Sequence, residues 1–137
     1  MALKPRYADA ILDGTKTVEL RRVRARLQPG QRVLVYASTP RKQLQGEFRV
    51  AKVTYGDPAT LWPSLAPHAG VTFSEFMHYF EGAAICCAIE VAAATRWQRP
   101  VELAELRAAI EDFTPPQSYC FVSDRFVEDL GTLGPAR

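Results

Sequence analysis

The 137-residue sequence contains few of the residues from which metal sites and many catalytic sites are built. It has two histidines, His68 and His78, and three cysteines, Cys86, Cys87 and Cys120. No C-x-x-C or Cys/His spacing of a zinc site occurs. Cys86 and Cys87 are adjacent, and neighbouring residues of a strand point to opposite faces. We therefore predict three reduced thiols, no metal and no cofactor.

The motifs of several common enzyme classes are also absent. There is no glycine-rich phosphate loop, no H-E-x-x-H helix and no G-x-S-x-G turn. With two histidines, a Ser-His-Asp or Cys-His arrangement would arise only by chance. No segment has the roughly 18 apolar residues of a membrane span, and the first residues lack the apolar stretch of a signal peptide. These absences predict a cytoplasmic protein with no membrane contact.

Charge is nearly balanced but unevenly distributed. The chain has 17 basic and 15 acidic residues, a formal net charge of +2. The segment before residue 53 is nevertheless strongly basic, and the remainder is net acidic. Its basic residues are Lys4, Arg6, Lys16, Arg21, Arg22, Arg24, Arg26, Arg32, Arg41, Lys42, Arg49 and Lys52. This asymmetry indicates either an anionic partner for the N-terminal part or an ordinary solvated surface, and the sequence leaves both open.

Apolar periodicity and turn residues predict one α+β domain over residues 1–130, with residues 131–137 as a frayed tail. Strands are expected at 17–22, 32–37, 46–55, 83–95 and 119–122. Helices are expected at 5–13, after 57, at 72–80, at 100–110 and after 123. A small barrel would remove exposed sheet edges. Its predicted core is Val18, Leu20, Val33, Val35, Phe48, Val50, Ile89 and Val91.

The most informative stretch for function is residues 14–22. Gly14 is expected to end a helix, Lys16 follows, and Glu19 and Arg21 project from one face of the next strand. One interpretation is a solvated ion pair worth about 0–1 kcal/mol. The other is a polar cleft, in which Arg21 binds a phosphate or a base edge in bidentate fashion. Lys16 would then be a point charge or, when desolvated, a base or nucleophile.

The same stretch lies within a family resemblance. The pattern Lys4-Pro5-x-Tyr7-Ala8-x-x-Ile11-x-x-Gly14-x-Lys16-Thr17-x-Glu19-x-Arg21 resembles the start of an ASCH domain, of the PUA-like superfamily. Collinear matches follow at Pro29-Gly30, Tyr36-Ala37-Ser38-Thr39-Pro40, Gly46-Glu47-Phe48, Tyr79-Phe80-x-Gly82 and Pro115-Pro116-Gln117-Ser118-Tyr119. The resemblance spans residues 2–122. It implies a PUA-like β-barrel of about five to six strands with short flanking helices, and an RNA-binding cleft.

We therefore predict an RNA- or nucleotide-binding module with its polar cleft around Lys16. In that reading the charged residues meet phosphate or base edges, and neutral side chains at the rim donate hydrogen bonds. A tyrosine, Tyr36 or Tyr79, would stack on an unpaired base. The candidate site residues are Lys4, Lys16, Glu19 and Arg21, with Ser38, Thr39, Gln117 and Ser118 at the rim.

The resemblance also implies alternatives. Some small bacterial members resemble amidohydrolases that deacetylate N4-acetylcytidine with the cleft lysine, a threonine three residues later and a glutamate before the next helix. Here Lys16 matches, Glu19 replaces the threonine, and no acid stands at 68–71. In an enzyme, Lys16 and Glu19 would be the catalytic residues. A weak ribonuclease and a protein-interaction adaptor with an empty cleft also remain open.

Overall fold

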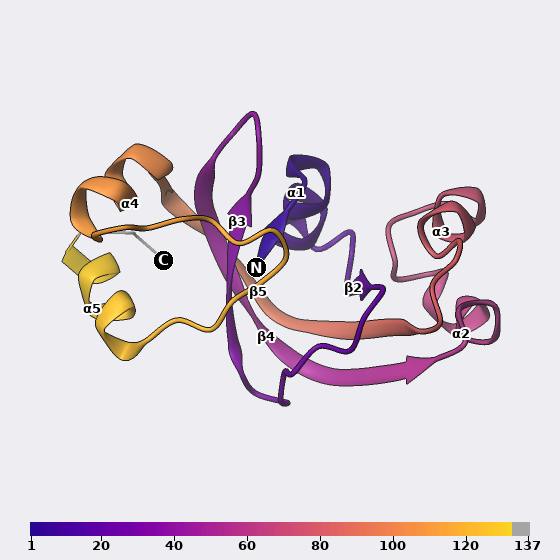
Figure 1. The fold of residues 1–137 in the computed structure, drawn as a ribbon. Coiled ribbons are helices and arrows are strands. Elements are labelled where there is room, and N and C mark those ends of the chain that lie inside the picture. The colour runs from indigo at the N-terminus through magenta and orange to yellow at the C-terminus, as the bar shows by residue number, and fades with distance from the viewer. Residues whose placement is uncertain (133–137) are drawn as a thin grey trace.

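The computed structural model describes residues 1–132 and has five strands and five helices in that range (Figure 1). The strands are β1 (Ala2–Leu3), β2 (Val18–Arg21), β3 (Arg32–Ala37), β4 (Gln43–Gly56) and β5 (Cys86–Glu102). The helices are α1 (Pro5–Asp13), α2 (Pro58–Leu65), α3 (Phe73–Tyr79), α4 (Leu103–Ala109) and α5 (Asp124–Thr132). The α+β class is confirmed.

Local signals account for the helix ends. Pro5 occupies the first turn of α1, where its missing N–H costs no hydrogen bond. Gly14 ends α1 with a left-handed backbone at φ 85°. Asp57 caps α2 through its side chain. Thr72 and Glu75 form a capping box at the start of α3. These helix starts agree with the sequence-based expectations.

The five strands form one mixed sheet in the order β1-β3-β4-β5-β2. β4 and β5 are long and pair antiparallel over most of their length, whereas β1 pairs parallel with β3. They form a curved ribbon with α2 and α3 at one end and α4 and α5 at the other (Figure 1). α1 lies between these two helix pairs. Because these helix pairs lie at the two ends of the sheet, the middle of the sheet is left open and can form a cleft.

The sheet is open, which corrects the expectation of a closed barrel. No strand pairing joins the edge strands β1 and β2 within residues 1–132. Instead, Arg21 Nη2 on β2 donates a hydrogen bond to the Ala2 carbonyl on β1 at 3.3 Å. β1 has two residues and β2 has four, so neither edge offers a backbone ladder long enough for closure. A side chain therefore connects the two edges.

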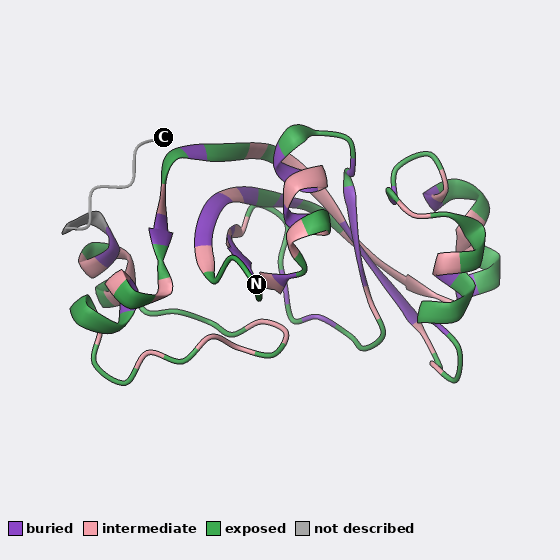
Figure 2. Cartoon of the chain, turned by 90° about the horizontal axis from the view of Figure 1, so that it is seen from above, coloured by how far each residue is buried: buried purple, intermediate pink, exposed green. Residues whose placement is uncertain are grey.

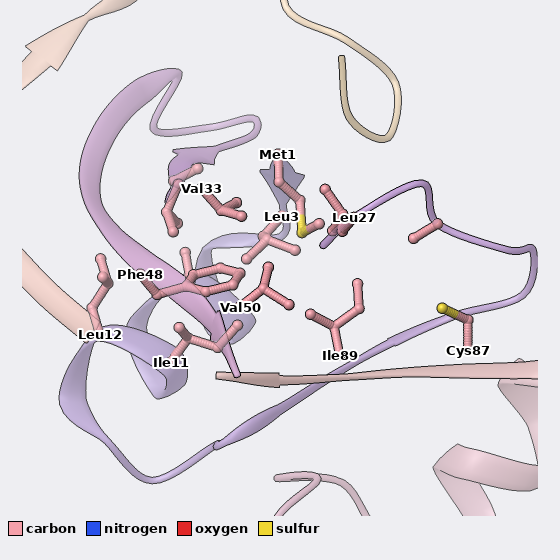
Figure 3. Close-up of a cluster of buried hydrophobic side chains, with 14 residues drawn as sticks. Met1, Leu3, Ile11, Leu12, Leu27, Val33, Phe48, Val50, Cys87 and Ile89 are labelled. Carbon is pink, nitrogen blue, oxygen red and sulfur yellow. The ribbon is translucent and has the colours of Figure 1, made fainter. Parts of the chain in front are cut away.

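The buried side chains form three clusters rather than one barrel core. Figure 3 shows the central cluster, in which Ile11 of α1 packs on Phe48 and Ile89 of the sheet. Val18 and Leu20 belong to a second cluster with α2 and α3. The third lies under α4 and α5. The core prediction was right about burial, except that Val91 is half-buried, but wrong about a single core.

β5 explains both the separate clusters and the thiol environments. It is covered on both faces near its start, so Cys86 faces the second cluster and Cys87 the central one. Both are fully buried, and Cys120 is exposed. All three are free. Buried residues follow the middle of the sheet and exposed ones the outer faces of the end helices (Figure 2). The divergence of the adjacent cysteines matches strand geometry.

Two other expectations differ from the structure. α4 begins at Leu103, not at 100, because β5 continues pairing with β4 to Glu102. Residues 119–122 form no strand; they are an irregular segment before α5. α5 ends at Thr132, so the expected tail of residues 131–137 begins within the last two residues of this helix. The rest of that segment, 133–137, lies outside the described residues. Within 1–132, no helix combines the length and apolar character of a membrane span.

Candidate functional site

A cleft of about 640 Å³ crosses the middle of the molecule. Its walls come from β1, α1, β2, the end of β3, α3, α4 and the segment 115–117. These elements are far apart in the sequence, and the cleft exists because the end helices flank the sheet. Its volume is in the range of small-ligand sites. Lys16, Glu19 and Arg21 all line it.

Lys16 is fully buried, with 1% of its surface exposed. Its Nζ donates a hydrogen bond to the Ala69 carbonyl and lies 5.3 Å from the centroid of the Tyr7 ring. Burial lowers the pKa of Lys16, and the Glu19 carboxylate opposes that by raising it. A partly desolvated amine beside a carboxylate can act as a charge or as a proton donor and acceptor.

Glu19 and Arg21 form an ion pair at 3.6 Å along one face of β2. Both side chains are mostly buried. The pair is therefore not the solvated surface ion pair that was one interpretation of the sequence. Glu19 also accepts a hydrogen bond from the Leu20 amide at 2.9 Å. Arg21 Nη1 donates to Ser118 Oγ at 3.0 Å. These contacts fix both side chains at the cleft floor.

One donor at this floor is unsatisfied. The Nε–H of Arg21 is buried and has no hydrogen-bond partner within residues 1–132. A buried donor without a partner costs about 1–3 kcal/mol. The Nη atoms of Arg21 are held by Ser118 and Ala2, so the guanidinium is fixed, and its Nε–H lies below the surface that a molecule in the cleft can touch.

The remaining sequence-predicted residues lie around this floor. Lys4 follows β1, Ser38 and Thr39 follow β3, and Gln117 lies in the segment before α5, and all four line the cleft. Ser118 does not line the cleft, but its hydroxyl accepts from Arg21 and its carbonyl accepts from the Ala2 amide at 2.7 Å. The structure thus brings seven of the eight candidates to one cleft, with the eighth directly behind it.

The two candidate stacking residues differ in access. Tyr36 is 5% exposed and belongs to the third core cluster, so little of its ring is open to a base. Tyr79 is 43% exposed, lines the cleft, and donates its hydroxyl to the Leu20 carbonyl at 3.3 Å. That bond holds the ring beside the floor residues. Burial raises the pKa of both hydroxyls, so neither is ionised near neutral pH.

Sequence reasoning missed four polar cleft residues: Tyr7, Lys42, Glu75 and Arg107. Lys42 stands in a left-handed backbone conformation, φ 51°, which is uncommon for a side-chain-bearing residue. Arg107 comes from α4 and carried no sequence signal. Glu75 lies within the helix expected at 72–80 and was not among the candidate site residues. It does cap α3, but it also accepts from Arg6 Nη2 at 2.7 Å.

Positive charge predominates in the cleft. Its lining includes the cations Lys4, Lys16, Arg21, Lys42 and Arg107, and the anions Glu19 and Glu75. Each anion already has an arginine partner. Lys4, Lys42 and Arg107 are exposed and have no carboxylate partner within residues 1–132. Residues 1–132 contain no group of three or more acidic, histidine or cysteine side chains that could hold a metal ion.

Comparison with known proteins adds a family context. The ASCH domain model matches residues 1–111. A protein of Zymomonas mobilis called an ASCH domain-containing ribonuclease is 30% identical over 133 residues, covering 97% of this chain and 89% of its own length. The crystal structure of an ASCH protein from Zymomonas mobilis covers 100% of this chain and 94% of its own, with TM-score 0.92 and 29% identity. A structure from Enterococcus faecalis, at TM-score 0.54 and 11% identity, shares the fold.

Proposed function

This chain belongs to the ASCH domain family, and we propose that it binds single-stranded RNA in the cleft above Lys16, Glu19 and Arg21. The observation that carries the proposal is a positively charged cleft in which three exposed cations, Lys4, Lys42 and Arg107, have no carboxylate partner within residues 1–132. Ammonium and guanidinium groups bind phosphate oxygens and base edges. The relative called a ribonuclease supports RNA as the ligand class.

In this proposal each part of the cleft has a distinct task. Lys4, Lys42 and Arg107 attract the phosphates from the rim, where their charges are unneutralised. Ser38, Thr39 and Gln117 supply neutral hydrogen bonds. Tyr79 offers a partly exposed ring for a splayed base. Stacking on such a ring requires an unpaired base, which is why single-stranded RNA fits better than a duplex.

A second proposal is cleavage of the bound RNA, favoured by the adjacent Lys16 and Glu19 and by the name of the relative. Glu19 would accept the proton of a ribose 2′-hydroxyl, and the 2′-oxygen would attack the adjacent phosphorus. Lys16 would donate a proton to the departing 5′-oxygen as its bond to phosphorus breaks. Arg21 would stabilise the charge on the phosphate. The products are a 2′,3′-cyclic phosphate and a 5′-hydroxyl.

The amidohydrolase alternative receives less support from this cleft. Gly70 lies in the segment where the resemblance places a catalytic glutamate, and its backbone is left-handed at φ 66°. Any side chain there would press on Lys16. Glu75 lines the cleft, but it is held by Arg6 and the Thr72 amide. In the amidohydrolases that the resemblance implies, the lysine would pair with a glutamate at this position. In this chain Lys16 packs against Gly70 instead.

Binding is tested by titrating dye-labelled single-stranded RNA with the purified protein at several salt concentrations. Lys42→Ala is expected to weaken binding and to reduce the slope of log K against log salt by about 0.7, the contribution of one phosphate contact on a single strand. Lys52→Ala is the matched control, because Lys52 is exposed on β4 and does not line the cleft. Equal effects of the two substitutions would reject the cleft as the binding site.

Cleavage is tested with the same RNA by separating the products. Glu19→Gln should abolish cleavage while leaving binding within about threefold, because the amide keeps the shape but cannot take a proton. RNA with a single 2′-deoxy position should resist cleavage there. Products with a 3′-hydroxyl, or deacetylation of N4-acetylcytidine by the same preparation, would contradict this mechanism.

A further inference from the structure

The basic first third of the chain is only partly explained by the cleft and by ion pairs. Four of its arginines have carboxylate partners: Arg6, Arg21, Arg32 and Arg41. Three successive arginines, Arg22, Arg24 and Arg26, follow β2 directly and are exposed. None of these three has a carboxylate partner within residues 1–132. We call residues 22–26 the arginine loop.

The arginine loop is anchored to the rest of the protein rather than free. Ala25 is buried, and its carbonyl accepts a hydrogen bond from the Tyr55 hydroxyl at 2.8 Å. The Arg26 amide donates to the Tyr119 hydroxyl at 3.0 Å. The Arg24 guanidinium lies 4.5 Å from the centroid of the Tyr55 ring. Arg22 Nη2 also donates to the Glu81 carbonyl at 3.0 Å. The loop is thus held in place although its three arginines are exposed, and this order lowers the entropy cost of binding an anion.

The arginine loop continues directly from the cleft. Arg21, at the cleft floor, donates to Ser118, and Tyr119 bonds the other end of the loop. The segment before α5 therefore runs alongside the loop (Figure 1). Phe121 packs edge-on against Tyr119 at 5.9 Å and is 60% exposed. Tyr119 thus links the arginine loop to the exposed ring of Phe121, which lines a second, smaller pocket of about 140 Å³.

We propose that the arginine loop, with Phe121, is an outer binding track for single-stranded RNA that extends beyond the cleft. Guanidinium groups bind phosphates in bidentate fashion, and an exposed ring stacks on an unpaired base of any identity. The inference rests on the proposed RNA-binding function of the cleft and deepens it. It makes the preferred ligand an oligonucleotide rather than a nucleotide or a modified nucleoside.

The test compares two ligands: a dinucleotide, which fills the cleft, and a single strand of about 12 nucleotides, within the range that such surfaces hold. The variant is the double substitution Arg24→Gln/Arg26→Gln. Loss of two phosphate contacts should weaken binding of the longer strand about tenfold at low salt and reduce its salt slope by about 1.4. Binding of the dinucleotide should not change. Arg24→Lys/Arg26→Lys should retain most of the slope, because the charge remains.

The matched control is Arg49→Gln/Lys52→Gln, which removes the same charge from exposed positions of β4. If the control weakens long-strand binding as much as the loop variant does, the effect is one of net charge and the track is rejected. Equal loss for anionic lipid vesicles and for RNA would also overturn the proposal. A cooperative thermal unfolding transition in each variant, with a midpoint close to that of the wild type, shows that the fold is retained.

Failure of the track and failure of the cleft give different results. If the cleft binds RNA but the track does not, Lys42→Ala weakens the binding of both ligands. The arginine-loop variant then weakens the binding of neither. If the cleft does not bind RNA, the wild-type protein does not bind the dinucleotide and Lys42→Ala has no effect. Phe121→Ala tests whether the exposed ring contributes to binding. It should weaken binding of the longer strand alone, by about fivefold or more, because one base loses its stacking partner.

Discussion

Gly70 lies directly against the side chain of Lys16. A methyl group at Gly70 would come within 3.0 Å of the Lys16 Cβ and within 3.2 Å of its Cγ. The neighbouring Ala69 carbonyl accepts the hydrogen bond of the lysine Nζ. The short segment before α3 therefore sets both the path and the end point of the buried lysine, although 53 residues separate Lys16 from Ala69.

Gly70→Ala should disturb Lys16 without altering any charge. Gly70 has φ 66°, so the substitution also strains the backbone. Gly30→Ala is the matched control, because Gly30 has φ 86° and no atom within 4 Å of the added methyl. Both variants should lose about 1 kcal/mol or more of stability. Only Gly70→Ala should also weaken RNA binding, and equal RNA affinity of the two would show that the position of Lys16 is unimportant.

Lys16→Met should remove the charge while keeping the length of the side chain. RNA binding should weaken and its salt slope should fall by about 0.7 if the ammonium contacts a phosphate. Lys16→Arg should instead lose about 1–3 kcal/mol of stability, since the larger guanidinium has no room between Tyr7 and Gly70. Anisotropy titrations and urea unfolding measure these effects. Wild-type affinity and slope in Lys16→Met would make the lysine purely structural.

Glu75→Gln should test the acid that the structure adds to the cleft. The hydrogen bonds from the Thr72 amide and from Arg6 lower the pKa of Glu75 to about 2, from an ordinary value of 4.5. A lowered folded-state pKa stabilises the fold above pH 4.5, and this contribution is lost as the pH falls towards 2. The stability difference between wild type and variant should therefore shrink across that interval, as followed by thermal unfolding.

The same substitution separates binding from amide hydrolysis. Removing a carboxylate from the cleft should leave RNA affinity unchanged or raise it slightly, because the phosphates lose a repelling neighbour. An amidohydrolase that used Glu75 as its acid or base would lose turnover. Thr60→Val is the control for a change at a helix start. It removes the hydrogen bond from the Thr60 hydroxyl to Asp57 at the start of α2, and Thr60 does not line the cleft.

The thiols should differ sharply in reactivity. Burial raises the pKa of Cys86 to about 11 and also raises that of Cys87, so neither is a thiolate near neutral pH. Cys120 is exposed. Native protein at pH 8 should take up one equivalent of an alkylating label, and denatured protein three. Cys120→Ser should take up none in the native state, and labelling of a second thiol would show that the cluster around Cys86 or the one around Cys87 opens.

The sequence by itself determined the starts of α1, α2 and α3, the left-handed stop at Gly14 and the placement of Glu19 and Arg21 on one face of β2. Each of these depends on residues within a few positions, through φ preferences, capping and the two-residue period of a strand. The family pattern, read along nearly the whole chain, also gave the ASCH assignment that the comparisons bear out.

Only the tertiary structure decided which charges meet in the cleft and where the sheet ends. Arg107 reaches the cleft because β4 and β5 curve and carry α4 back over it, and Lys42 because the chain turns there in a left-handed conformation. The open sheet, with Arg21 reaching Ala2 and Ser118, depends on packing between segments 19 and 97 residues apart. Local patterns carry no information about such contacts, because burial and charge pairing are decided by whichever distant segments the fold brings together.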